Sequence, residues 1–458
     1  QYINEPSLRT YNSAGTEKPG TPHDNEVDDY RQTHYQLHFD QAVTPFARLT
    51  TALHYTKGSG FFEQYKADQG LAGYGYPDDT TLISDLIRRR WLDNDFYGFT
   101  STLHFGKPGE RYFLVGTGWN KYLGNHFGEV IWNEENVSND LLSPYYEDEA
   151  EKRDWNLFLR TNMKMGQKMD ATVDLQGRWI LYEFVGLSNN GAPLDQSVKH
   201  NFFNPKLGLT YNISEASSLY LLSGLNHKEP NRDDYVDSSP NSRPGAEQLW
   251  DTELGFRFSK KNWRLNLNGY YMSYKDQLVP TGRLNDVGAY TRVNVEDSYR
   301  AGVETELSIQ LLKSLGFRLH ATVSDNKIKS FNEYIDNWTT GAQEIVAHEN
   351  TDLAFSPQFL SSAYLDYTIL SKAKWAITAD ISGRYVGKQF VDNTSNPDSE
   401  LDSYFVSDAG VSLKMFPKFV KEMSLGFRVN NLTDAEYESN GWIYRFRSPE
   451  YDPVPDDP

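Results

Sequence analysis

The sequence lacks cysteine, long apolar runs and any excess of basic residues. None of its 458 residues is cysteine, so disulfide bonds play no part in the fold. No window approaches the run of about 20 apolar residues that a membrane-spanning helix needs, and the mean hydropathy is −0.66. Acidic residues outnumber basic ones, 63 to 45, whereas a nucleic-acid partner calls for a basic face. These absences exclude a disulfide scaffold and a helical membrane protein, and they argue against a nucleic-acid partner.

Period-two alternation is the strongest feature that the sequence does have. In the stretch 263–278, WRLNLNGYYMSYKDQL, apolar or small residues fill the odd positions from Trp263 to Tyr271, and polar residues fill positions 264, 266 and 268. Such alternation predicts a strand with one apolar and one polar face. The strand is longer than the roughly 5 to 6 residues of a soluble strand and matches the roughly 9 to 11 residues of a tilted membrane strand.

The same alternation recurs in pairs of segments along the chain. It predicts about sixteen strands between residues 35 and 433, arranged in hairpins. Turns within a hairpin are short, as at Thr44-Pro45, Ser214-Glu215 and Lys260-Lys261. The connections between hairpins are expected to be long and include residues 57–94, 124–151, 183–199, 228–246 and 329–356.

Short turns on one side and long loops on the other are typical of barrels in the bacterial outer membrane. The sequence therefore predicts an all-β fold, a transmembrane antiparallel β-barrel in the outer membrane. Trp155, Trp179, Trp250, Trp263, Trp375 and Tyr385 are candidates for its aromatic girdles. A soluble propeller or sandwich with uneven loops is the alternative.

The turn pattern also predicts the side on which each end of the chain lies. If the short turns are periplasmic, residues 1–34 and 434–458 are both extracellular loops, the second one truncated. A natural barrel begins and ends on the periplasmic side, so we expect at least one further strand beyond each end. Residues 1–5 have neither the basic region nor the apolar run of a signal peptide, which fits a mature chain or a piece of one.

Several short motifs resemble those of TonB-dependent outer-membrane receptors. The segment 428–437, RVNNLTDAEY, followed by Gly441, is similar to the penultimate-strand motif of that family. The others, in chain order, are 227–235 (HKEPNRDDY), 244–250 (PGAEQLW) with Glu253-Leu254-Gly255, Asn294 with Gly302-Val303-Glu304, and 383–387 (GRYVG) with Asp392-Asn393-Thr394. The resemblance rests on the order of these motifs along the chain. It extends from about Tyr35 to the end and is strongest to receptors of the Bacteroidota group.

The resemblance implies a barrel of about twenty-two strands, of which this chain would supply roughly the sixth to the twenty-first. It also implies a plug domain that fills the lumen. The implied partners are outer-membrane lipid, the plug and remaining strands of the same receptor, a nutrient ligand, and TonB, which would contact a region upstream of Gln1.

The implied function is active import of a scarce nutrient bound at the extracellular face, with a ferric siderophore or a similar metal chelate as the leading substrate. Cobalamin, haem, an oligosaccharide or a peptide are alternative substrates, and a passive porin or a surface-binding barrel is the alternative function. No Gly-x-Ser-x-Gly or His-Glu-x-x-His arrangement occurs, so we expect no enzyme, no cofactor and no resident metal.

Candidate substrate-binding residues are cations and aromatics outside the expected membrane strands. Arg88, Arg89 and Arg90 would hold an anionic iron chelate through charge-assisted hydrogen bonds. Pairing of this run with Asp85, Asp93 and Asp95, or with the plug, is the alternative. Aromatic side chains expected in the long loops could grip a ligand or pack the loops on one another; they include Tyr74, Tyr76, Trp132, Tyr145, Tyr146, Tyr334 and Trp338.

Histidines that share a phase with polar residues, His38, His54, His104 and His320, raise a haem or metal pathway as a further reading. The alternative is that these histidines are ordinary polar residues that line a water-filled lumen. No histidine lies in 231–243, between the two motifs where a haem receptor of this family would be expected to have one, which weakens the haem reading.

Overall fold

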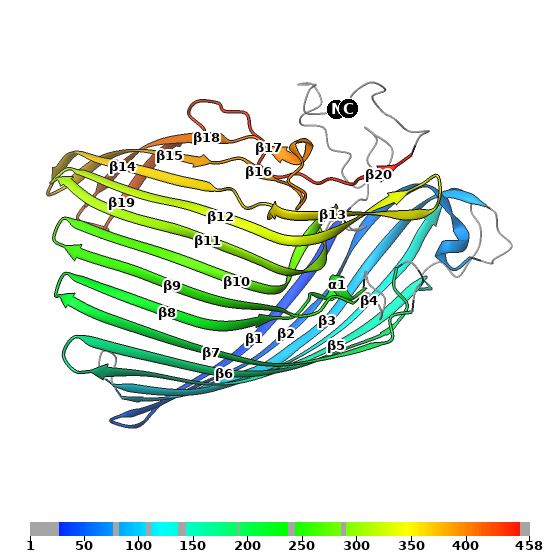
Figure 1. Ribbon diagram of the computed structural model, residues 1–458, viewed down its shortest axis with the longest axis horizontal. Helices are drawn as coiled ribbons and strands as arrows, with labels where there is room; N and C mark the ends of the chain where they lie inside the picture. The colour runs from blue at the N-terminus through cyan, green and yellow to red at the C-terminus, as the bar shows by residue number, and fades with distance from the viewer. Residues whose placement is uncertain are drawn as a thin grey trace. The chain divides into compact units, whose positions relative to one another are not determined.

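The computed structural model of the protein describes residues 27–76, 82–106, 111–135, 143–189, 191, 193–236, 243–284 and 290–448. The chain forms two compact units. The first comprises Gln1–Arg160 and Gln176–Phe202, and the second comprises Thr161–Leu175 and Phe203–Pro458. Nearly all of the described secondary structure is β-strand (Figure 1). Within the described residues, no helix has the length and apolar character needed to cross a membrane.

Among the described residues, eighteen strands belong to one sheet and two short ones pair separately. The strands are β1 (Asp28–Thr44), β2 (Ala47–Gly70), β3 (Ile83–Gly106), β4 (Tyr112–Asn133), β5 (Tyr146–Met165), β6 (Met169–Gly186), β7 (Gln196–Ser214), β8 (Ser217–Lys228), β9 (Glu247–Lys260), β10 (Trp263–Leu284), β11 (Tyr290–Leu312), β12 (Leu315–Asn337), β13 (Ala342–Asp352), β14 (Phe359–Lys372), β15 (Trp375–Val386), β16 (Gln389–Phe390), β17 (Glu400–Leu401), β18 (Tyr404–Met415), β19 (Met423–Val429) and β20 (Phe446–Arg447). The helical turns are η2 (Leu71–Tyr74), α1 (Arg232–Val236) and η3 (Pro397–Ser399).

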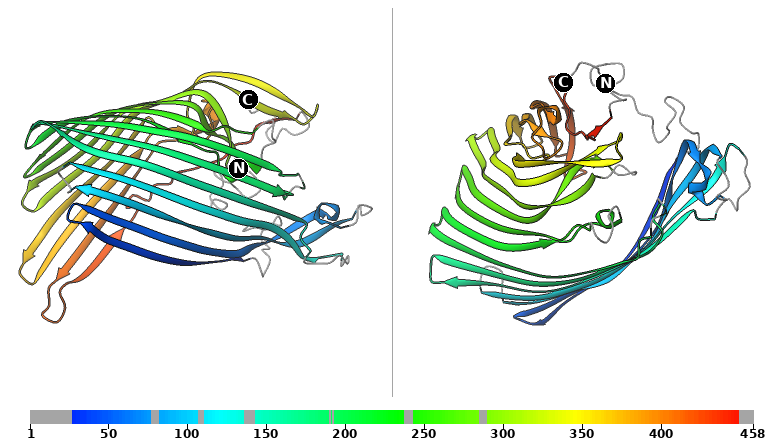
Figure 2. Two further views of the ribbon diagram at one scale, coloured as in Figure 1. Left: turned by 90° about the horizontal axis from the view of Figure 1, so that it is seen from below. Right: turned by 45° about the vertical axis from the view of Figure 1, so that its right-hand side comes forward.

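Neighbouring long strands pair antiparallel in chain order. In the first unit β1, β2, β3 and β4 pair in succession. In the second unit β8 pairs with β9, β9 with β10, β10 with β11 and β11 with β12. Figure 1 shows β8 to β12, coloured green to yellow, side by side, and both views of Figure 2 keep them together. Short turns and simple neighbour pairing make this an up-and-down sheet.

The strands expected from the sequence are confirmed, but several of them are longer than the alternation indicates. β1 begins at Asp28 rather than near Tyr35, and residues 1–26 lie outside the described residues. The expected loop 228–246 falls between β8, which ends at Lys228, and β9, which begins at Glu247, and it contains α1; its residues 237–242 lie outside the described residues. The expected loop 57–94 is wrong, because β2 and β3 stay paired up to Gly70↔Ile83.

The other expected loops also need correction. In place of 124–151 and 183–199, strands continue to Asn133 and Gly186 and resume at Tyr146 and Gln196. Most of 329–356 is the hairpin of β12 and β13. Beyond the apolar band neither strand face meets lipid, so the period-two pattern fades although backbone pairing continues.

The apolar face of the alternating strands is exposed and the buried clusters are small. Leu37 is 64% exposed and Leu254 61% exposed, as expected of side chains that face lipid. One cluster joins Leu71, Tyr76, Leu86 and Val130 in the first unit. Another joins Val279, Val295, Ile328 and Leu353 in the second unit. Both clusters lie on the long-connection side of the strands, where they fix the segments that carry candidate site residues.

Asparagines from the sequence motifs hydrogen-bond to backbone groups of neighbouring segments in the second unit. Asn294 donates from Nδ2 to the carbonyl of Asp276 at 2.6 Å and accepts the amide of Gly245 at 2.7 Å. Asn393 and Asn431 likewise each donate from Nδ2 and accept at Oδ1, which satisfies backbone carbonyl and amide groups. These three motif asparagines therefore have a structural role in this chain, which is to hydrogen-bond the backbone.

Candidate ligand-binding site

The three arginines lie on β3, each opposite one residue of β2. Gln64 pairs with Arg88 in the register, Glu63 with Arg89 and Phe62 with Arg90. Because side chains alternate along a strand, Arg88 and Arg90 share one face and Arg89 points to the other. Arg89 donates from Nε to Glu63 at 2.8 Å and lies 4.3 Å from the centre of the Phe61 ring. Arg89 is therefore a neutralised, structural residue.

Arg88 and Arg90 meet a group of tyrosines instead. Arg88 donates to Gln64 Oε1 at 2.8 and 3.1 Å and to the Tyr74 hydroxyl at 3.3 Å. Arg90 donates from Nε to the Tyr146 hydroxyl at 3.3 Å. The Tyr74 and Tyr145 rings are 4.8 Å apart, and those of Tyr145 and Tyr146 are 5.0 Å apart. We call Arg88, Arg90, Tyr74, Tyr145 and Tyr146 the arginine–tyrosine group.

The arginine–tyrosine group is positively charged at Arg88, whose partners within the described residues are all neutral. The hydroxyl of Tyr145 is buried and has no hydrogen-bond partner among the described residues. Burial raises the pKa of the Tyr145 phenol, and the nearby Arg88 opposes this shift. A cation beside a neutral, unpartnered hydroxyl is suited to an acceptor-rich, anionic ligand.

Arg88 and Arg89 do not pair with Asp85, Asp93 or Asp95, which is the alternative that the sequence suggests for the arginine run. Lys57 takes Asp93 and Asp95 as its partners, and Tyr65 donates to Asp85. Glu63, which no sequence pattern singles out, is the carboxylate that Arg89 binds. Register across the hairpin, rather than proximity in sequence, decides these pairs.

Two of the candidate aromatics in the first unit lie apart from the arginines. Tyr76 is 3% exposed and packs in the cluster with Leu71 and Leu86, where its hydroxyl accepts from Asn133 Nδ2 at 3.0 Å. Tyr74 and Tyr145 pack against the same cluster, so Tyr76 supports the arginine–tyrosine group from behind. Trp132, on β4 opposite Ile87, is 40% exposed.

Tyr334 and Trp338 belong to the second unit, at the end of the β12–β13 hairpin. Tyr334 is 52% exposed, and the Trp338 ring stacks on Phe446 at 4.2 Å. Beside them lies a cavity of about 280 Å³, lined by Thr281, Val293, Phe331, Asn332, Glu333, Tyr334, Gln343, Asp392, Asn393, Thr394, Ile443 and Arg445.

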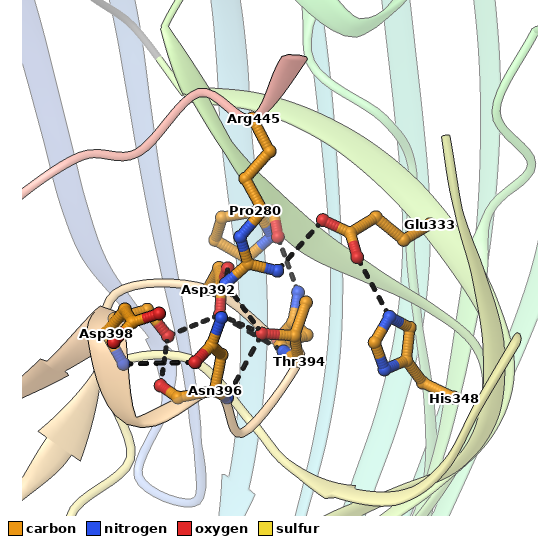
Figure 3. A network of polar contacts seen from close by, with 10 residues as sticks. Pro280, Glu333, His348, Asp392, Thr394, Asn396, Asp398 and Arg445 are labelled. Atoms are coloured by element: carbon orange, nitrogen blue, oxygen red, sulfur yellow. Dashed lines mark hydrogen bonds and ion pairs between the residues drawn. The ribbon is translucent and has the colours of Figure 1, made fainter. Parts of the chain in front are cut away.

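A polar network that the sequence did not predict borders this cavity (Figure 3). Arg445 contacts Glu333 at 3.0 Å and Asp392 at 2.9 Å, and Glu333 also contacts His348 Nε2 at 2.8 Å. Asp392 belongs to a motif found in the sequence, but nothing there connects it to Glu333 or Arg445. Within the described residues, no group of three or more His, Cys, Asp or Glu side chains is arranged to hold a metal ion.

The family model described as "TonB dependent receptor-like, beta-barrel" matches residues 2–432. No curated protein matches the chain. Solved structures share the fold at low identity: the siderophore receptor PiuA from Acinetobacter baumannii (15% identity, TM-score 0.68, 92% of this chain and 62% of that one) and the copper transporter OprC (13%, 0.69, 90% and 61%). The ferric-catecholate import receptor Fiu from E. coli K12 is similar too (12%, 0.64, 92% and 62%).

The chain spans less than two thirds of the length of these structural neighbours. Its alternating strands, exposed apolar face and neighbour pairing are the features that the family match explains. The chain belongs to the TonB dependent receptor-like β-barrel family, and it is an outer-membrane protein.

Proposed function

We propose that this chain is part of an outer-membrane receptor that binds a scarce, anionic nutrient at its extracellular face and imports it with energy from TonB. A ferric siderophore or a similar metal chelate is the substrate class that the arginine–tyrosine group fits best. Import of such a ligand requires tight binding, and release of a tightly bound ligand requires an energy input. The plug domain and the remaining strands of the same receptor, TonB and outer-membrane lipid are the proposed partners.

The observation that carries the proposal is the environment of Arg88. Its guanidinium is held by the neutral groups of Gln64 and Tyr74, next to the unpartnered hydroxyl of Tyr145. Arg88 is partly buried, and removing part of a charge from water without a counter-charge is costly; a bound anion would supply that counter-charge. The solved siderophore receptors that share the fold support the choice of an iron chelate.

The test uses the complete receptor in outer-membrane vesicles and in cells. We expect iron-loaded catecholate and hydroxamate chelates to compete for one binding site, and uptake to stop when the proton-motive force is collapsed. Arg88→Gln should weaken binding, whereas Arg89→Gln should not, because Arg89 is already neutralised by Glu63. Uptake that persists without energy, or a large ungated conductance in liposomes, would instead favour the passive porin.

A further inference from the structure

The segment Gly441–Arg447, here called the strap, is fastened to the end of the β12–β13 hairpin. β20 pairs in parallel with β12, with Asp336 opposite Phe446. The Tyr444 hydroxyl donates to Asp336 Oδ2 at 2.6 Å, and the Trp338 amide donates to the Arg447 carbonyl at 2.9 Å. Backbone, side-chain and ring contacts therefore hold the strap against one element.

Arg445 joins the strap to a second element as well. One guanidinium nitrogen contacts Glu333 of β12 at 3.0 Å, and the other contacts Asp392, in the turn after β16, at 2.9 Å. The second nitrogen also donates to Thr394 Oγ1 at 3.0 Å. The side chain of Asp392 is 4% exposed and that of Arg445 21%. The ion pairs are thus shielded from solvent and lose little to salt screening.

Both carboxylates are held in place without help from the strap. His348 Nε2 lies 2.8 Å from Glu333 Oε2. Asp392 Oδ1 accepts from the Thr394 amide at 3.1 Å and from Ser399 Oγ at 2.9 Å. Asn393 fixes the same turn by donating to the Pro280 carbonyl at 2.6 Å. Figure 3 shows Arg445 reaching down from the strap between Glu333 and Asp392. The receiving site is therefore preorganised.

The strap also forms one wall of the cavity of about 280 Å³. Ile443 and Arg445 line it from the strap, and the other lining residues include Phe331, Tyr334 and Thr281. Its volume is several times the roughly 30 Å³ that one water occupies in the liquid. Lifting the strap would remove this wall, so the position of Arg445 determines how far the cavity is open to solvent.

We propose that the strap is a lid over this cavity and that Arg445 is its latch. The lid is closed by the protein's own charges, and opening it requires both ion pairs of Arg445 to break together. The neighbouring Arg447 makes a matched contrast, since its contact with Glu344 at 3.2 Å joins side chains that are 61% and 44% exposed. Exposed pairs contribute little, so Arg447 does not act as a latch. This proposal is independent of the nutrient that the receptor imports.

The absence of native cysteine allows a direct test in the complete receptor, kept free of other cysteines. Ile443→Cys places a thiol on the cavity wall, and Thr340→Cys places a reference thiol on the exposed hairpin turn. Maleimide labelling is then followed in vesicles. We expect Arg445→Gln to accelerate labelling at position 443 by about tenfold, equivalent to about 1.4 kcal/mol, with no change at position 340.

Arg447→Gln is the matched control and should label at position 443 at nearly the unsubstituted rate. Equal rates with and without Arg445, or equal acceleration by Arg445→Gln and Arg447→Gln, would overturn the latch. If Arg445→Gln does not insert into the membrane, Asp392→Asn removes one of the two ion pairs with little change in shape. Its labelling at position 443 should then rise severalfold, and an unchanged rate would reject the proposal.

Discussion

The two units use arginine in opposite ways. In the first unit Arg88 is held by Gln64 and Tyr74, both neutral, and so keeps its charge available. In the second unit Arg445 is held between Glu333 and Asp392, which cancel its charge. The same guanidinium is suited to ligand binding in one setting and to fastening a segment in the other. The identity of the residue facing the arginine decides which role it takes.

The largest effect is expected from Arg88→Gln. A hydrogen bond to a charged group contributes about 1.5–3 kcal/mol, so affinity for an anionic iron chelate should fall by about 10- to 100-fold. Equilibrium binding to the complete receptor measures this loss. Arg89→Gln, one residue away on the other strand face, is the control and should bind normally. Equal losses in both variants would mean that general destabilisation, not the charge at Arg88, controls affinity.

Glu333→Gln tests the role of Arg445 in the second unit, because it removes one of the two counter-charges of Arg445. The isosteric amide leaves the pair with Asp392 intact, so the strap should loosen without detaching. We expect a cost of about 1–2 kcal/mol. Because the Trp338 amide bonds to the Arg447 carbonyl of the strap, its hydrogen exchange should become roughly tenfold faster. Unchanged exchange at Trp338 would show that the backbone pairing of β20 suffices to hold the strap.

Gln64→Glu would make Arg88 resemble Arg445. The new carboxylate would face Arg88 directly across the β2–β3 register. The variant keeps the size and shape of the side chain, so the stability of the sheet should hardly change. Affinity for the anionic chelate should drop by about 1 kcal/mol, or about fivefold. A titration at several salt concentrations separates this effect from screening, and stronger binding in the variant would contradict the proposed role of Arg88.

The period-two pattern made the strands of this fold predictable because lipid demands an apolar side chain at every second position. It failed where that demand ends. Residues 57–70 and 83–94 continue β2 and β3 beyond the apolar band. Because the alternation stops there, the sequence pattern indicates loops where the strands in fact continue. Gln64 faces Arg88 because β2 and β3 stay in register in this extended part of the hairpin. Once the strand extension is known, the partner of each arginine follows by counting along β2.

The contacts of Arg445 with Glu333 and Asp392 could not be predicted from the sequence, for a different reason. Arg445 and Glu333 are far apart in the chain, and Asp392 lies in a third segment. No spacing rule connects three such segments, since their contacts depend on how irregular connections fold back over strand ends. The motif Asp392-Asn393-Thr394 was recognised in the sequence, and its role as the base of the network required the structure.

The smallest effect is expected from Arg447→Gln, which tests whether burial decides the role of an arginine in the strap. Arg447 and Glu344 form an exposed pair at 3.2 Å, and such pairs contribute about 0–1 kcal/mol because water and salt screen them. Exchange of the Trp338 amide should therefore change less than about fivefold, although Arg447 supplies the carbonyl that this amide binds. The backbone carbonyl is unaffected by the substitution. A change as large as that in Glu333→Gln would mean that the outer pair fastens the strap as firmly as the shielded one, and the contrast between shielded and exposed pairs would fail.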